Sequence, residues 1–194
     1  MEEKVAVIEA LLFASETLLT SEQLVEILPD TEKKEIVSLL EGLMREYETR
    51  GGGICLKEVA GGFQFRTRTD LALWVRKLKA GRPAMLSAAA LETLAVVAYR
   101  QPLVKAEIDR IRGVDASGAL KGLLEKKLVR IVGRKDVPGK PIIYGTTRKF
   151  LEVFNLRDLS ELPTLRELKD LPDQPDEPDL PRPQEQTELP DLQE

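Results

Sequence analysis

The 194-residue chain contains no histidine and a single cysteine, Cys55. Without histidine there is no imidazole to serve as a general base, a metal ligand or a proton shuttle, which excludes the triads that depend on one. One cysteine permits neither an internal disulfide nor a thiolate metal cluster. Most classes of enzyme chemistry are therefore excluded, and we expect a protein that is not an enzyme and needs no cofactor.

Long apolar runs are also missing. No segment approaches the roughly 20 uncharged apolar residues of a membrane helix. Residues 1–10 carry three glutamates, where a signal peptide would be basic. The sequence therefore predicts a cytoplasmic protein. Its 42% hydrophobic residues are enough for packed cores and argue against a wholly disordered chain.

Charge divides the chain into three segments. The net charge is −2 over residues 1–83, +6 over residues 84–155 and −8 over residues 156–194. The last segment holds seven of the twelve prolines. Its acidic, proline-rich part at 171–194 has too little apolar surface to offset the entropy of ordering, so we expect a disordered tail there. A short leucine-containing extension at 156–170 precedes it.

The first two segments each predict three amphipathic helices followed by a β-hairpin. In the first, apolar spacing and capping residues predict helices over 3–15, 21–28 and 32–50, with Thr31 capping the third. A hairpin over 54–67 should turn at Gly61 and Gly62, and a further helix starts at Asp70. We expect Ile27 to face inward on the second helix, and Trp74 and Tyr99 to anchor cores.

In the second segment, helices are expected to begin at Ser87, near Val104 and near Asp115 or Ser117, with Leu91 facing the core. A hairpin over 129–146 and a last short helix follow. Three pairs of core positions are each 84 residues apart, which indicates a duplicated unit. The pairs are Leu24 with Ile108, Leu39 with Leu123, and Leu40 with Leu124.

Three helices followed by a hairpin is the element order of a winged helix. The predicted fold class is therefore mainly α with β-hairpin wings (α+β). We expect an N-terminal winged-helix domain at 1–80, a linker at 81–86 and a C-terminal winged-helix domain at 87–155. The extension and the disordered acidic tail complete the chain.

Several motifs of the second segment are long enough to be specific. They are LSAAALETLAVVAYRQP at 86–102, AEIDRIRGVD at 106–115, and the loop GRKDVPGKP at 133–141, followed by YGTT at 144–147. In these motifs the chain resembles the bacterial segregation and condensation protein B family. The resemblance extends over roughly residues 4–165.

This resemblance implies a homodimer formed largely through the N-terminal domains. It implies binding of the kleisin, segregation and condensation protein A, and through the kleisin a link to the structural maintenance of chromosomes ATPase. The basic wing and the small residues of the second unit place the expected kleisin site in the C-terminal domain. Such a protein is a nucleoid-associated adaptor in chromosome condensation, chromosome partition and cell division, and it regulates the ATPase.

A winged helix also suggests an alternative, a DNA-binding transcriptional regulator whose third helix reads base edges with long polar side chains. The third helix of the second unit lacks them, because its outward positions include Gly118, Ala119 and Gly122. We therefore expect DNA contact to be nonspecific at most. Small residues either admit the backbone of a partner protein or pack on neighbouring elements of the same chain.

The loop at 133–141 is basic and glycine-rich but does not match a phosphate-binding loop. Five residues separate Gly133 from Gly139, where that motif has four, and a strand follows. Its prolines stiffen a wing. Its cations, Arg134, Lys135 and Lys140, can also meet an acidic partner or a phosphate backbone.

Arg100 and Gln101 end the first helix of the second unit. They are either C-terminal capping groups or exposed partner contacts, and we favour contacts. The predicted partner-binding residues are Arg100, Gln101, Gly118, Ala119, Gly122, Arg134, Lys135 and Lys140.

Overall fold

The computed structural model describes residues 2–78, 85–164 and 167. Most of the expected linker at 81–86 and the whole of the expected tail at 171–194 lie outside the described residues. We call residues 2–78 the first half and residues 85–162 the second half, and each is described by itself.

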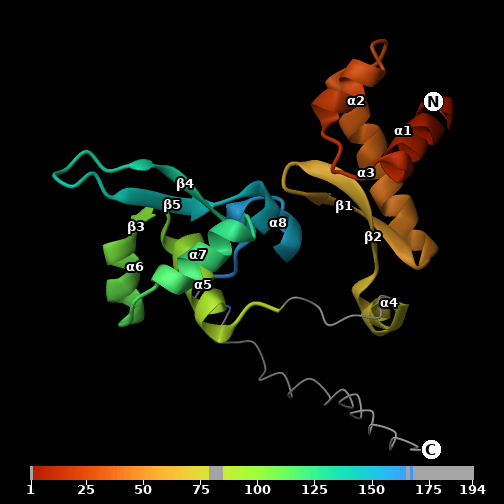
Figure 1. Cartoon of the computed structure of the whole chain (residues 1–194). Helices are drawn as coiled ribbons and strands as arrows, with labels where there is room; N and C mark the ends of the chain where they lie inside the picture. Colours follow the sequence, from red (N-terminus) through yellow and green to blue (C-terminus); the bar gives the residue numbers. More distant parts are fainter. Residues whose placement is uncertain (1, 79–84, 165–166, 168–194) are drawn as a thin grey trace, which may run out of the picture. The chain divides into compact units, whose positions relative to one another are not determined.

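The first half begins with three helices and continues with an antiparallel hairpin (Figure 1). Helices α1 (Glu2–Ala14), α2 (Ser21–Ile27) and α3 (Lys33–Arg50) precede β1 (Ile54–Val59) and β2 (Gly62–Thr67). A 3-10 turn, η1 (Thr69–Leu71), leads into α4 (Ala72–Leu78). The apolar stripes expected on α1 and α3 meet in one core, formed by Ile8, Leu12, Leu24, Ile36, Leu39, Leu40, Leu43, Tyr47, Leu56 and Phe63.

Local chemistry sets most of these boundaries. Thr20 caps α2 with a capping box, since its hydroxyl accepts from the Gln23 amide while the Gln23 side chain accepts from the Thr20 amide. The predicted cap of α3 is wrong: Glu32 is the N-cap residue, and Thr31 is buried. The predicted turn is displaced by one residue, because Ala60 (φ 52°) and Gly61 (φ 70°) occupy its two central positions.

The second half repeats this order and adds a third strand. It contains α5 (Ala88–Arg100), β3 (Leu103–Val104), α6 (Lys105–Arg112), α7 (Ser117–Glu125), β4 (Val129–Arg134), β5 (Ile142–Thr146) and α8 (Arg148–Phe154). The strand order is β3-β5-β4, with antiparallel pairing throughout. The first half has a counterpart of β3, since Leu19 bridges Phe63 just as Leu103 pairs with Tyr144. Leu19 and Leu103 are again 84 residues apart.

The second half has its own core. It is built around Leu94, Val97, Ile108, Leu120, Leu123, Val129 and Phe150. Leu156 and Leu162 pack against this core, and a short 3-10 turn, η2 (Leu159–Glu161), lies between them. The extension that follows residue 155 is therefore a docked turn as far as Leu162.

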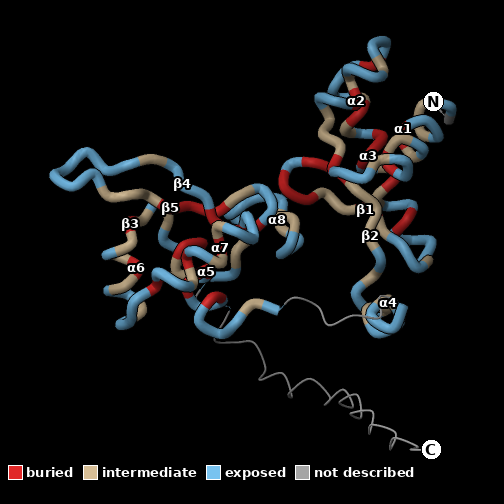
Figure 2. Tube along the Cα trace, in the orientation of Figure 1, coloured by how far each residue is buried: buried red, intermediate tan, exposed pale blue. Residues whose placement is uncertain are grey.

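Several apolar residues expected inside are exposed. Ile27 is 49% exposed, Leu91 46%, Trp74 64% and Tyr99 39%. On α5 the buried face runs through Ala90, Leu94 and Val97, and Leu91 lies beside this face on the helical wheel. In Figure 2 buried residues line the inner side of α5 and α7, whereas the tip of the β4–β5 hairpin is exposed.

Candidate partner-binding surface

Helix α7 carries two glycines, Gly118 and Gly122, on a strip that we call its bare face, and the side chains of Ser117, Lys121 and Glu125 are exposed beside it. A Cβ atom built on Gly118 or Gly122 meets no other atom within 4 Å. Among the described residues, these two glycines therefore do not pack on a neighbouring element. Ala119 is half-buried beside them. The face is free for the backbone of another molecule to approach closely.

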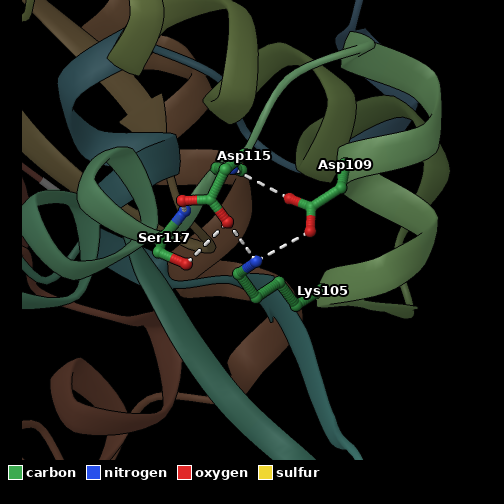
Figure 3. Close-up of polar contacts among 5 residues, drawn as sticks. Lys105, Asp109, Asp115 and Ser117 are labelled. Atoms are coloured by element: carbon green, nitrogen blue, oxygen red, sulfur yellow. Dashed lines mark hydrogen bonds and ion pairs between the residues drawn. The ribbon is translucent and has the colours of Figure 1, made fainter.

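A polar network holds the start of α7 against α6 (Figure 3). The Lys105 ammonium bonds Asp109 one turn along α6, with 2.7 Å between Nζ and Oδ2, and it also bonds Asp115. The other Asp109 oxygen accepts from the Ala116 amide at 2.8 Å. Asp115 accepts from the amide of Ser117 at 3.2 Å and from its hydroxyl at 2.9 Å. Hydrogen bonds to Asp109 on α6 and to Asp115 therefore hold the turn between the two helices in place.

These contacts favour the ionised forms of all three groups. The hydrogen bond from Lys105, followed by the bond from the Ala116 amide, lowers the pKa of Asp109. Lys105 and then Ser117 lower the pKa of Asp115, while Asp109 and then Asp115 raise the pKa of Lys105. Lys105 is shared by the two carboxylates, so the network at the entrance to α7 keeps a net charge of −1.

Gln101 is engaged inside the second half. Its amide nitrogen donates to the Thr146 hydroxyl at 2.9 Å and to the Ala98 carbonyl at 3.3 Å, and its amide oxygen accepts from the Thr146 amide at 2.7 Å. The side chain therefore joins the end of α5 to β5, and we do not retain it as a partner contact. Arg100 is exposed next to it.

The wing between β4 and β5 is an ordered hairpin end. Its backbone closes through the Lys135 amide, which donates to the Pro141 carbonyl at 2.9 Å. The Lys135 ammonium lies 3.2 Å from a Glu107 oxygen on α6, which ties the wing to that helix. Bonds from the Val104 amide and then Lys135 lower the pKa of Glu107. Arg134 and Lys140 are exposed and form no ion pair with any other described residue.

The predicted contact residues thus occupy three places on the second half: the end of α5, the bare face of α7 and the wing. Within the described ranges no hydrogen bond or ion pair links one place to another. The network of Lys105, Asp109 and Asp115 was not predicted as part of the site. The spacing of Lys105 and Asp109, one helical turn apart, was the only signal for it in the sequence.

No cluster of three or more cysteine or acidic residues placed to hold a metal ion occurs in the described part of the chain. Within that same part, no helix is long and apolar enough to cross a membrane.

Comparison with known proteins gives a consistent result. The family model described as "Segregation and condensation complex subunit ScpB" matches residues 6–165. Segregation and condensation protein B of Syntrophotalea carbinolica is 53% identical over 156 residues, which are 80% of this chain and 79% of that protein. The protein of the same name from Symbiobacterium thermophilum is 45% identical over 155 residues, with coverages of 80% and 70%.

Two solved structures are also similar. ScpB from Mycobacterium tuberculosis is 34% identical, covering 80% of this chain and 96% of that one, with a TM-score of 0.38. A dimer of an ScpB N-terminal domain complexed with an ScpA peptide is 29% identical, with coverages of 40% and 95% and a TM-score of 0.37.

The match to a segregation and condensation complex subunit spans nearly all described residues of both halves. This chain belongs to the ScpB family.

Proposed function

We propose that this protein is a non-catalytic adaptor made of two tandem winged-helix domains. As a homodimer it binds the kleisin, segregation and condensation protein A, and thereby regulates the structural maintenance of chromosomes ATPase in chromosome condensation and segregation. It acts in the cytoplasm, at the nucleoid. The observation that carries this proposal is family membership over residues 6–165, which include every element of both halves except the first residues of α1.

The kleisin-binding surface we propose is the bare face of α7. Gly118 and Gly122 lie one turn apart on a helix whose start is held by the Lys105 network. A partner segment can therefore pack on a preformed surface without a rearrangement of this chain. Arg100, Ala119 and the wing cations Arg134 and Lys140 complete the proposed contact.

The homodimer contact we propose is in the first half. Helix α4 exposes Leu73 (49%), Trp74 (64%) and Leu78 (84%), an apolar surface typical of an interface. The net charge of residues 1–83 is only −2, so two copies meet little electrostatic repulsion. In one relative, an N-terminal domain dimer was solved with an ScpA peptide.

The alternative, a sequence-specific DNA-binding regulator, has less support. Gly118 and Gly122 present no side chain that could reach a base edge, and Lys121 is the one exposed cation between Ser117 and Glu125. The unpaired cations of the wing support DNA contact that is independent of sequence and sensitive to salt.

The test is calorimetric titration of the full chain with the central region of its kleisin. Gly122→Arg should abolish binding by steric clash. It should leave folding intact, because the position is open and arginine is a better helix former than glycine by about 1 kcal/mol.

Gly42→Arg is the matched comparison. Gly42 lies within α3 of the first half, and a Cβ there also meets no atom within 4 Å. It receives the same change of size and charge and should leave kleisin affinity unchanged. If Gly42→Arg blocks binding while Gly122→Arg does not, the kleisin site lies in the first half. If the unmodified chain does not bind the kleisin, the adaptor function is wrong.

A further inference from the structure

Four cations of the second half lie where α7, β4 and α8 meet. They are Lys126 and Lys127 in the turn after α7, Arg130 on β4, and Lys149 in the first turn of α8, and we call them the basic cluster. All four are exposed, and none forms an ion pair with another residue of the described ranges. Their charge is therefore available to a partner of opposite charge.

Hydrogen bonds around Thr146 and Thr147 hold these three segments together. The Thr147 hydroxyl donates to the Lys127 carbonyl at 2.6 Å and accepts from the Phe150 amide at 3.1 Å, so it joins the turn to the start of α8. The Arg130 guanidinium donates to the Thr146 carbonyl at 3.2 Å. The backbone under the cluster is therefore fixed before any partner binds, although its lysine side chains remain in solvent.

The surroundings of the cluster are positive. The carboxylates nearest to its members in the sequence are Glu125, just before the turn, and Glu152 on α8. Glu152 lies 3.9 Å from the Arg148 guanidinium, and these two charges compensate each other. With Glu125 counted against the four cations, a net charge of +3 remains, which is half of the +6 of residues 84–155.

The cluster has the composition of a phosphate-binding surface rather than that of a protein interface. Leu128 and Val129, the apolar residues between its members, are 4% and 2% exposed, so no apolar side chain is presented among these cations. The centre of a protein interface is usually an apolar or aromatic anchor. Phosphate groups require only cations and hydrogen-bond donors.

The same surface favours a duplex over a single strand. Proteins hold unpaired bases by stacking them on aromatic rings. Phe150, which follows Lys149, is 3% exposed, so its ring belongs to the core and is not offered to a base. The backbone of a duplex presents phosphates without any need for stacking, and it is contacted independently of sequence.

The basic cluster is distinct from the wing. Arg130 is at the start of β4, next to α8, whereas Arg134 and Lys140 lie toward the tip of the β4–β5 hairpin (Figure 1). The cluster also lies beyond the last residue of α7, and not on the glycine strip of that helix.

From this arrangement we infer that the basic cluster binds the phosphate backbone of double-stranded DNA without sequence preference. The contact uses the end of α7 and the start of α8, and not base edges read by a recognition helix. This inference goes beyond the proposed function, because kleisin binding does not require it.

Fluorescence anisotropy of the full-length protein with labelled duplexes of about 20 base pairs tests this assignment. Two duplexes of unrelated sequence should bind equally, and the affinity should fall steeply between about 50 and 200 mM salt. The triple variant Lys126→Gln, Lys127→Gln, Lys149→Gln should weaken binding at least about tenfold at the lower salt concentration. It should also reduce the slope of log affinity against log salt by roughly 2 to 3, since each lost phosphate contact contributes about 0.9.

A second triple variant is the matched control. Arg100→Gln, Arg110→Gln and Lys121→Gln remove the same total charge from exposed positions of the same half, outside the cluster. This variant should keep the affinity for DNA within about threefold. Both triple variants change only exposed side chains, so urea denaturation should give the midpoint of the unmodified chain.

Three results would overturn the inference. The first is a duplex that stays unbound at about 50 mM salt, and the second is equal weakening by the two triple variants, which would mean that net charge alone attracts DNA. The third is tighter binding of a polyglutamate peptide than of a duplex with the same charge, which would assign the cluster to an acidic protein.

Titration with the kleisin separates this inference from the proposed function. The cluster variant should bind the central region of the kleisin as the unmodified chain does. Loss of kleisin binding in this variant, with DNA binding retained, would assign the cluster to the kleisin and overturn the DNA contact while the adaptor function stands.

Discussion

Gln101 shows how one side chain can join two elements that are distant in sequence. Its amide group bonds both the amide and the hydroxyl of Thr146, 45 residues away, and Thr146 is 8% exposed. A Cβ on Gly145 would lie 2.9 Å from the Gln101 amide oxygen, so a larger residue there would displace this side chain from its hydrogen bonds. The glutamine therefore satisfies the backbone donor of Thr146, a buried residue of β5.

We predict that Gln101→Ala lowers the free energy of unfolding by about 1–3 kcal/mol, the cost of a buried polar group left without a partner. Arg100→Ala, at the exposed neighbouring position, should change it by less than about 0.5 kcal/mol. Urea denaturation followed by circular dichroism measures both. Gly145→Ala should be less harmful in the Gln101→Ala background than alone. Equal stability of Gln101→Ala and the unmodified chain would contradict the role given to this amide.

Asp109 makes stability depend on pH. Lys105 and the Ala116 amide hold its pKa below the value of about 3.9 expected in the unfolded chain. A lowered folded-state pKa contributes stability above the unfolded value, and this contribution is lost as the pH falls through the folded value. Asp109→Asn should therefore destabilise the protein at neutral pH, and the difference should shrink as the pH falls below about 3.9, the unfolded value.

Unfolding curves measured at neutral pH and at an acidic pH below the unfolded pKa of Asp109 give the difference in the free energy of unfolding. Lys105→Gln is the companion variant, because it removes the charge that lowers the Asp109 pKa. It should show the same dependence on pH. A loss of equal size at both pH values would mean that Asp109 acts through packing or uncharged hydrogen bonds only.

At the scale of elements, the wing is a hairpin whose charge is only partly available. Lys135 forms an ion pair with Glu107. Arg134 donates a hydrogen bond to the Lys140 carbonyl but forms no ion pair within the described residues. Exposed charges at the edge of an interface act mainly on the rate of association.

We therefore predict that Arg134→Ala and Lys140→Ala slow association with the kleisin and weaken its dependence on salt, with little change in dissociation. Lys135→Ala should have a smaller effect on association, because Glu107 already balances that charge. Stopped-flow fluorescence at several salt concentrations measures these rates. An unchanged association rate together with faster dissociation would place the wing inside the contact.

At the scale of the whole molecule, the two halves have separate main cores, and a smaller cluster of Leu18, Val59 and Ala60 of the first half packs against Leu151 of the second. The core around Ile8, Leu24 and Leu40 contains only residues of the first half, and the core around Leu94, Ile108 and Leu123 only residues of the second. Each half therefore has the packed interior that an independently folding unit requires.

We predict that a fragment of residues 1–80 folds and dimerises, and that a fragment of residues 84–170 folds as a monomer. Light scattering gives the mass of each. Trp74→Ser should weaken the dimer of the first fragment, because α4 exposes this ring. Phe13→Ser is the control, since Phe13 is 81% exposed on α1 of the same half. A monomeric first fragment and a dimeric second one would reverse the assignment.

The sequence alone was sufficient for features that depend on neighbours along the chain. The periods of the apolar residues predicted α1, α3, α5 and both hairpins, because a stripe on a helix or strand is visible in the order of residues. The spacing of 84 residues predicted the repeat of element order. The motifs of the second half led to the correct family.

Only the tertiary structure decided which apolar side chains are buried and which polar side chains form hydrogen bonds between distant segments. Trp74 and Leu91 are exposed although apolar side chains of this size are usually found in a core, because burial depends on what packs opposite each helix. The two-residue strand β3 is too short for a periodic signal, and it exists because β5 pairs with it. Gln101 meets Thr146, and Thr147 meets the carbonyl of Lys127, through contacts between distant segments. Such contacts have no period in the sequence, since they form when separate elements pack together.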